Sequence, residues 1–440
     1  MLLINRGKSM IKNVTILGAN GNMGKNVAAI WASFGNCNIN LVVRNLDDKE
    51  YIIKSAIESV KADSIITRLN FLTYDELEKC IPSSDFIFES VSEQIDIKRE
   101  VFKKIIPFLN EETIIGTGTS GLSVEYLAEI LPNKNRKNFY GIHFFNPPYN
   151  LTLCELIKTR YNSESGIKEL KEYLEKKLFR DVIVVKDEPA FLGNRIGFFF
   201  INRCLQLAEK YKENGGIDYI DTIFGGYTGR AMAPIVTSNF VGLDVHKAIV
   251  NNVSFHAINK FDSQSFQLPN YVDELIEKKY LGRKVGIGFY QKEIDGKEPF
   301  VFDIASKKYR EKEKYSFHFS NQIAAHIANG EYEEAAKVLK NNDSLEAKIC
   351  LELLLEYILY SLQVTEIVGE TQHAADIAMA TGFNWVPPLA LCDYLGGEKE
   401  FKALCWEKLS AEAKSYYEAV LNKKISHSNY DFRSFIKGKV

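Results

Sequence analysis

The sequence predicts an α/β fold with a doubly wound, mainly parallel sheet at the N-terminus, followed by an all-α C-terminal part that is duplicated. Three observations lead to this prediction. Up to about residue 190, apolar runs typical of strands alternate with helical segments, as in parallel sheets covered by helices. From residue 191 onward, long stretches with helical periodicity replace the strands. Two segments of that part, 215–244 and 375–397, repeat the same order of features.

The first predicted element is a strand over residues 14–17, which runs through the glycine turn "GANGNMG" into a helix. Here Gly18 would form the tight turn, Gly21 would let the backbone approach a pyrophosphate, and Gly24 would let helix and strand pack closely. This order predicts a Rossmann-type dinucleotide-binding unit with phosphate at the helix N-terminus. A purely structural glycine turn is the alternative. The expected cofactor contacts in this turn are Gly18, Gly21, Asn22, Met23 and Gly24.

Further strands are predicted over residues 39–44, 85–91 and 113–120. Where the first of these ends, NAD-binding units usually have an acid for the ribose, but this chain has Arg44. Arg44 could instead pair with a 2′-phosphate, or it is a solvated surface residue. Hydroxyl groups at the end of the last strand, Ser120 among them, would lie at the carboxyl edge of the sheet, where open α/β sheets bind ligands.

The segment "GIHFFNPPYNLTLCEL" (141–156) resembles a buried hairpin around a proline turn, yet it contains His143 and Glu155. Burying an ionisable group costs free energy unless the group is paired. The two residues are therefore either a satisfied core pair or a working acid/base pair.

At 440 residues, two or three domains are expected. Changes in the sequence pattern predict three, over 11–190, 191–300 and 301–440. Residues 291–320 are polar and charge-rich, which indicates a linker or surface loops before helices resume over about 320–422. A net charge of −2 gives no reason to expect nucleic acid as a partner. The seven cysteines form no C-x-x-C pair, and no apolar run is long enough to span a bilayer. We therefore expect a cytoplasmic protein without a metal site.

In order, and nearly in spacing, the motifs resemble those of the 3-hydroxyacyl-CoA dehydrogenase family, the hydride-transfer enzymes of fatty-acid β-oxidation. The resemblance covers about residues 11–290 and, more faintly, 345–400. It is carried by "GNMG", "SDFIFESVSEQIDIKREVFKKI", "TGTSGLS", "GIHFFNPPYNLTLCEL", "EPAFLGNR", "GRAMAPIVTSNFVGLD" and "LGRKVGIGFY". The most specific of these motifs is "GIHFFNP" with a glutamate twelve residues after the histidine.

The resemblance implies that the chain interconverts (S)-3-hydroxyacyl-CoA and 3-ketoacyl-CoA, with NAD, or alternatively NADP, as the hydride carrier. It implies that His143 is the general base and that Glu155 orients its imidazole. Ser120 and Asn194 would contact the substrate oxygens. The remaining cofactor contacts are expected at Arg44, Glu93 and Lys98.

The chain also departs from the family pattern, with an extra residue in the glycine turn and with Arg44, Gly118, Ala190 and Asn239 at positions where the family has other residues. The alternatives are therefore a non-catalytic sensor or scaffold that binds a dinucleotide or acyl-CoA, and a dehydrogenase of another hydroxy acid. A hydratase or thiolase partner would be a separate chain. The second helical repeat resembles the duplicated C-terminal domain of the family's larger members. It predicts a monomer, since a second copy can cover the same apolar surface within one chain.

Overall fold

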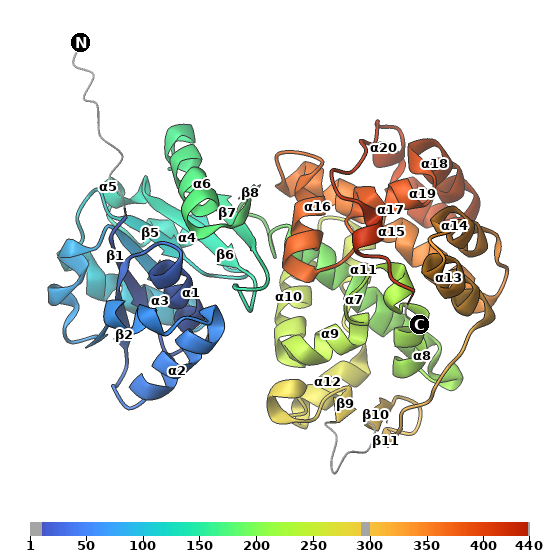
Figure 1. Ribbon diagram of the computed structural model, residues 1–440, viewed down its shortest axis with the longest axis horizontal. Coiled ribbons are helices and arrows are strands. Elements are labelled where there is room, and N and C mark those ends of the chain that lie inside the picture. The colour runs from blue at the N-terminus through green and yellow to red at the C-terminus, as the bar shows by residue number, and fades with distance from the viewer. Residues whose placement is uncertain (1–10, 292–299, 439–440) are drawn as a thin grey trace. The chain divides into compact units, whose positions relative to one another are not determined.

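The computed structural model describes residues 11–291 and 300–438 (Figure 1). Its contacts divide the chain into two compact units with the border between Phe191 and Leu192. The first unit contains an eight-stranded sheet, and the second is mainly helical. This is the predicted fold class. The further border predicted at residue 300 stays a prediction.

The sheet of the first unit has the strand order β3-β2-β1-β4-β5-β6-β7-β8. All neighbouring strands are parallel except β6 and β7, which form an antiparallel pair. Parallel strands bring their carboxyl ends to one edge, so the loops after β1, β2, β4 and β5 share that edge. The strands are β1 (Asn13–Leu17), β2 (Asn38–Val43), β3 (Leu69–Thr73), β4 (Phe86–Glu89), β5 (Ile114–Thr117), β6 (Phe139–Phe144), β7 (Leu153–Lys158) and β8 (Asp181–Lys186).

Helices flank this sheet, and their apolar sides pack on it (Figure 1). Trp31 of α1 shows why, because its buried ring lies 4.5 Å from the ring of Phe86 in β4 and 5.4 Å from that of Tyr173 in α6. The helices are α1 (Asn22–Ser33), α2 (Lys49–Val60), α3 (Ile95–Ile105), α4 (Val124–Glu129), α5 (Asn133–Arg136) and α6 (Glu164–Leu178). Four short 3₁₀ turns are also present: η1 (Asp63–Arg68), η2 (Leu77–Lys79), η3 (Ile81–Ser83) and η4 (Ile106–Phe108).

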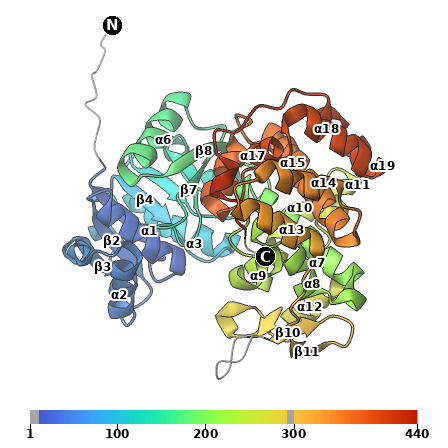
Figure 2. The ribbon, with the colours of Figure 1, turned by 45° about the vertical axis from the view of Figure 1, so that its right-hand side comes forward.

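The second unit is built around α7 (Gly193–Lys210) and α15 (Leu345–Val368), which pack together. The rings of Phe199 and Tyr360 stack between them at 3.9 Å. Most of α15 is buried, as expected for a helix that is apolar on all sides. Figure 2 shows α13 (His318–Ala328) and α14 (Tyr332–Asn341) side by side.

The other helices of this unit are α8 (Ile217–Ile223), α9 (Pro234–Val241), α10 (Leu243–Phe255), α11 (Lys260–Ser265), α12 (Asn270–Glu277), α16 (Ala374–Ala378), α17 (Pro388–Tyr394), α18 (Gly397–Lys408), α19 (Ala411–Tyr416) and α20 (Glu418–Leu421). Short turns are η5 (Lys212–Asn214), η6 (Gly226–Thr228), η7 (Arg283–Val285), the π turn η8 (Met379–Phe383) and η9 (Phe432–Ser434).

Two local expectations were incomplete. The strand β3 was not predicted. Part of the segment around 291–320, all of which was expected to be a linker or loops, instead forms an antiparallel sheet of β9 (Tyr290–Gln291), β10 (Phe300–Asp303) and β11 (Lys308–Glu311). Part of that segment, 292–299, lies outside the described residues. Lys308 and Glu311 of β11 are exposed, whereas Arg310 is half-buried and its Nη2 lies 2.7 Å from Oδ1 of the buried Asp218.

The two segments that repeat a sequence pattern also repeat a hydrogen bond. Asp221 of α8 accepts a hydrogen bond from the backbone N of Ile235 at 2.7 Å, at the start of α9. Asp376 of α16 accepts one from the backbone N of Leu389 at 2.9 Å, at the start of α17. In each half, an aspartate of one helix thus satisfies an unpaired N–H of the next.

The two repeated segments share a second contact, in which a hydroxyl group donates a hydrogen bond to the aspartate. Tyr290 donates its hydroxyl hydrogen to Asp221 at 2.6 Å, and Ser428 donates to Asp376 at 2.5 Å. The backbone N–H groups of the same two residues donate to the polar residues five positions after the helix-starting prolines, Asn239 and Asp393. These matched contacts support the predicted duplication.

None of the helices in the described ranges is long and apolar enough to cross a membrane. All seven cysteines are free and buried.

Candidate functional site

The glycine turn follows β1 at the carboxyl edge of the sheet. Gly18 has φ +81°, and a Cβ there would lie 2.7 Å from the carbonyl oxygen of Ser90. A Cβ on Gly24 would lie 2.5 Å from the carbonyl oxygen of Gly18. Both positions therefore require glycine. A Cβ on Gly21 would meet nothing closer than 3.4 Å, so packing within the protein does not require glycine there. Close approach of a pyrophosphate to the backbone would require glycine at this position.

The N-terminus of α1 provides a second feature of a dinucleotide site. Gly21 is its N-cap, no side chain caps the first turn, and that turn contains no acidic residue. Its backbone N–H groups are therefore open to an anion. The predicted contacts Asn22 and Met23 lie in this turn, exposed and half-buried respectively. The residues present thus fit the pyrophosphate of NAD.

Arg44 is exposed and directly follows β2, as the sequence predicted. Its contact with a cofactor stays a prediction.

Lys98 is buried in α3, and its ammonium lies between two carboxylates. Its Nζ is 2.8 and 3.0 Å from the two oxygens of Glu89, and 3.2 Å from Oε2 of Glu93. Glu89 ends β4, is fully buried, and accepts a hydrogen bond from the hydroxyl of Thr117 at 2.6 Å. A buried ammonium is tolerable only when it is paired in this way.

Glu93 links this ion pair to the loop that contains Ser120. Its Oε1 accepts hydrogen bonds from the hydroxyl of Thr119 at 2.5 Å, from the backbone N of Ser120 at 2.8 Å and from that of Gly121 at 3.1 Å. Burial alone would raise the pKa of Glu93, but the charge of Lys98 and these hydrogen bonds outweigh burial and lower it. Glu93 therefore stays ionised and holds the loop.

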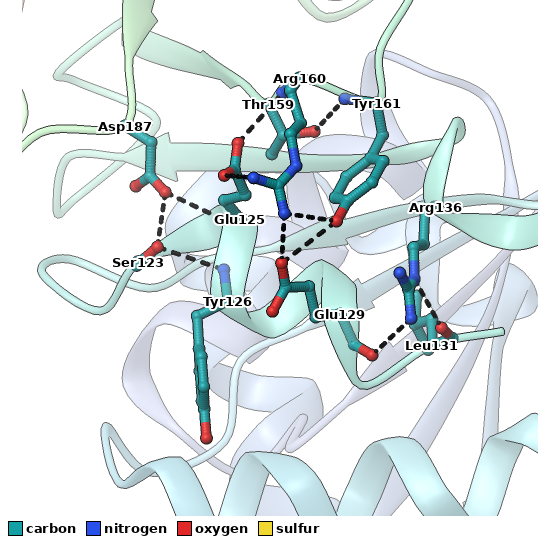
Figure 3. A network of polar contacts seen from close by, with 10 residues as sticks. All are labelled: Ser123, Glu125, Tyr126, Glu129, Leu131, Arg136, Thr159, Arg160, Tyr161 and Asp187. Carbon is teal, nitrogen blue, oxygen red and sulfur yellow. Dashed lines mark hydrogen bonds and ion pairs between the residues drawn. The ribbon is translucent and has the colours of Figure 1, made fainter. Parts of the chain in front are cut away.

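The other end of that loop is held by Asp187, as Figure 3 shows. Asp187 follows β8 and accepts hydrogen bonds from the hydroxyl of Ser123 at 2.7 Å and from the backbone N of Val124 and Glu125 at 3.0 and 2.9 Å. A carboxylate at this place caps the first turn of α4. The loop bearing Ser120 is thus fixed on both sides.

His143 and Glu155 face each other across the antiparallel pair β6–β7. The Nδ1 of His143 lies 2.7 Å from Oε2 of Glu155. His143 is 5% exposed and Glu155 is fully buried. The rings of Phe145 and Phe191 lie 4.8 and 5.6 Å from the imidazole. Because Nδ1 is engaged, Nε2 is the ring nitrogen that remains for proton transfer.

Asn194 lies in the first turn of α7, in the second unit, and is 8% exposed. Because it belongs to the other unit, its predicted action together with His143 stays a prediction. Ala190, which stands where the family has glycine, has φ +61°, in the left-handed region that favours glycine.

Sequence reasoning missed two residues of this site, Glu89 and Asp187. An acid ending the otherwise apolar run "FIFE" was a usable signal for Glu89, because an acid rarely ends a buried strand unpaired. Asp187 offered no such signal, because the residues that it contacts at the start of α4 lie 62 to 64 positions earlier in the sequence. Within 11–291 and 300–438, no cluster of three or more His, Cys, Asp or Glu side chains is placed to hold a metal ion.

Comparison with known proteins agrees with this geometry. Residues 13–188 match the family model for "3-hydroxyacyl-CoA dehydrogenase, NAD binding domain", and residues 191–292 match that for "3-hydroxyacyl-CoA dehydrogenase, C-terminal domain". The chain is 29% identical over 369 residues to a probable 3-hydroxyacyl-CoA dehydrogenase of Bacillus subtilis, covering 83% of this chain and 45% of that protein. It is 28% identical over 390 residues to a putative fatty acid oxidation complex trifunctional enzyme of Rickettsia felis, covering 85% and 52%. The chain thus spans about half the length of these relatives.

Among solved structures, 3-hydroxybutyryl-CoA dehydrogenase of Escherichia coli is similar in fold, with a TM-score of 0.68 at 17% identity. The match covers 93% of this chain and 98% of that one, so the shared fold extends through most of the second unit. (S)-3-hydroxybutyryl-CoA dehydrogenase of Ralstonia eutropha matches at 27% identity with a TM-score of 0.56, over 64% of this chain and 100% of that one.

Proposed function

The chain belongs to the 3-hydroxyacyl-CoA dehydrogenase family, with the NAD-binding domain of that family over residues 13–188. From this premise we propose that it interconverts an (S)-3-hydroxyacyl-CoA and the matching 3-ketoacyl-CoA. The observation that carries the proposal is the buried contact of 2.7 Å between His143 and Glu155. A buried histidine held by a carboxylate has what a general base near neutral pH needs: an orienting partner and a counter-ion for imidazolium.

In the proposed oxidation, Nε2 of His143 removes the proton of the 3-hydroxyl group as the C3–H bond of the substrate breaks. Glu155 holds the imidazole through Nδ1 and stabilises the imidazolium that forms. In the reverse direction the imidazolium returns the proton to the ketone oxygen. Bound NAD supplies the hydride acceptor, and the chain supplies position and the proton.

Ser120 and Asn194 are proposed to contact the substrate oxygens. For Ser120, the rigidity of its loop supports this role, because Glu93 and Asp187 hold the loop on both sides. A hydroxyl held in one place can donate to a developing oxyanion without first being ordered. For Asn194, the support is its matching place in the "EPAFLGNR" motif.

We further propose NAD, rather than NADP, as the preferred cofactor, with weak discrimination between them because Arg44 replaces an acid at the end of β2. Arginine can form a charge-assisted contact with a 2′-phosphate, whereas aspartate would repel it. The substitution Arg44→Asp should move the ratio of kcat/KM values towards NAD by at least about tenfold, or ~1.4 kcal/mol. An unchanged ratio would place Arg44 in solvent, away from the ribose.

The direct test of the activity is the oxidation of NADH or NADPH by acetoacetyl-CoA, followed at 340 nm. The proposal expects turnover with NADH. Tight binding of NADH and acetoacetyl-CoA without turnover would favour the non-catalytic sensor or scaffold. If acetoacetyl-CoA does not oxidise the reduced cofactor but a free keto acid does, the result would favour a dehydrogenase of another hydroxy acid.

The remaining proposals concern the protein's setting. We place it in the cytoplasm, since its seven cysteines are all unpaired. A related protein from Rickettsia felis is described as a putative fatty acid oxidation complex trifunctional enzyme. A separate hydratase or thiolase is therefore the kind of partner we propose.

We also propose a monomer, because the second helical repeat can take the place of a second subunit. Light scattering at micromolar concentration tests this, and a stable dimer would contradict it.

A further inference from the structure

A cavity of about 860 Å³ lies in the second unit, outside every residue used above for catalysis or cofactor binding. Its wall combines the turn between α8 and α9, the segment 312–315 after β11, Asn384 from the second helical repeat, and the C-terminal segment 434–437. Its volume is within the range of small-molecule sites.

Arg230 is the buried member of this wall. It is 4% exposed, and its Nη1 donates to the carbonyl oxygen of Thr228 at 3.0 Å. Its Nε and Nη2 have no hydrogen-bond partner among the described residues. Burial lowers the pKa of Arg230 to about 10, so the guanidinium keeps its charge at neutral pH. Buried donors without partners on a charged group are costly. Because both nitrogens are also shielded from solvent, an acceptor in the cavity would reach them only after a small shift of the Arg230 side chain.

Aromatic rings hold the guanidinium in place but do not replace that acceptor. The Cζ atom of Arg230 lies 3.7 Å from the ring centroid of Phe200, 4.9 Å from that of Trp385 and 5.0 Å from that of Tyr357. Such contacts are cation–π attractions to the ring faces and contribute up to about 2 kcal/mol when desolvated. The N–H groups of the guanidinium point along its own plane and need an oxygen.

The charges around the cavity favour a dianion. Four cationic side chains line it, Arg230, Lys312, Lys314 and Lys437, against two acidic ones, Asp221 and Glu313. The oxygens of Asp221 already accept hydrogen bonds from Ile235, Val236 and Tyr290. Burial raises the pKa of Asp221 to about 7, so the excess is at least two positive charges at neutral pH. This matches a phosphate group, which carries nearly two negative charges at neutral pH.

We propose that this cavity binds a phosphate-bearing small molecule, with the phosphate between Arg230 and the lysines at positions 312 and 437. Guanidinium and ammonium groups together suit phosphate, because the first offers paired donors and the second a point charge. The rings of Tyr315 and Phe435 also line the cavity and offer apolar surface for an organic group. The ligand would contact both helical repeats and thereby stabilise their packing.

The test is titration calorimetry with inorganic pyrophosphate as the probe, in the presence of saturating NAD so that the glycine turn of the first unit is occupied. Ionic strength is kept constant with sodium chloride, and sodium sulfate is titrated in parallel. We expect pyrophosphate to bind the wild type and to bind the double variant Lys312→Gln/Lys437→Gln at least about tenfold more weakly. Both lysines are exposed, so this variant should fold normally.

The matched control is Lys308→Gln, an exposed lysine of β11 that does not line the cavity, and it should leave the affinity unchanged. Arg230→Met should abolish binding; if this variant does not fold, the lysine variant decides. Equal affinity of the wild type and the lysine double variant would overturn the proposal. So would an absence of binding to the wild type at millimolar concentration, or equal affinity for sulfate and pyrophosphate.

Discussion

Two buried histidines, one in each unit, differ in what they contact. His143 of β6 has a carboxylate as its partner, with Nδ1 at 2.7 Å from Glu155. His246 of α10 is fully buried between two neutral groups, with Nδ1 at 2.9 Å from the hydroxyl of Ser238 and Nε2 at 3.2 Å from Oδ1 of Asn202.

The partners of His246 determine its protonation. The amide nitrogen of Asn202 donates to the carbonyl oxygens of Ser265 and Gln267, so its Oδ1 is left as an acceptor. His246 must therefore carry its hydrogen on Nε2 and accept at Nδ1. Burial lowers the pKa of His246 to about 3, and no charged group opposes this. His246 is a neutral part of the core.

The comparison teaches that burial alone does not make a histidine a base. What differs is the charge of the partner, because a carboxylate can stabilise imidazolium inside the protein and a hydroxyl or amide cannot. The following predictions test that difference, in order of decreasing effect.

The largest effect is expected for His143→Gln. Loss of the general base should lower kcat by about 10²–10⁴, with little change in NADH affinity. The matched control is His246→Gln, which should retain near wild-type turnover under conditions where it is folded. Steady-state kinetics with acetoacetyl-CoA compares the two variants. Equal losses of kcat would mean that catalysis does not distinguish the two histidines.

A smaller effect is expected for Glu155→Gln, which keeps the shape of the partner but removes its charge. Turnover should fall by about 10–10², the value of a hydrogen bond to a charged group. Because imidazolium loses its counter-ion, the acidic limb of the pH–rate profile for oxidation should move to lower pH. An acidic limb that stays in place would show that Glu155 acts on the orientation of the ring alone.

The smallest effect concerns stability and His246. The folded protein keeps this side chain neutral, whereas the unfolded chain binds a proton below about pH 6.5. Its contribution to stability is thus present above pH 6.5 and lost as pH falls, by about 1.4 kcal/mol per pH unit. Urea unfolding of the wild type and His246→Gln at pH 7, 6 and 5 should show their difference shrinking by about 2 kcal/mol. A constant difference would mean that His246 is protonated in the fold.

Much of the fold followed from local patterns. The strands β1, β2, β4 and β5 are short apolar runs buried on both faces, so the sequence alone located them within a few residues. The strand β3 was not predicted because it lies at the edge of the sheet and is only partly buried, so its sequence contains no continuous apolar run. The strands β10 and β11 escaped for a similar reason, since a small antiparallel sheet can have one face in solvent.

By itself, the sequence determined the glycine turn and the pairing of His143 with Glu155. These depend on short-range geometry: a turn between a strand and a helix, and a hairpin whose two strands bring residues twelve positions apart face to face. Only the tertiary structure decided which other polar groups meet. The hydroxyl of Thr117 meets Glu89 because β4 and β5 are neighbours in the sheet, and Arg230 meets Tyr357 and Trp385 because the two helical repeats pack together. Burial makes each such contact matter, and the partner that a buried charge finds is set by the packing of segments far apart in the chain.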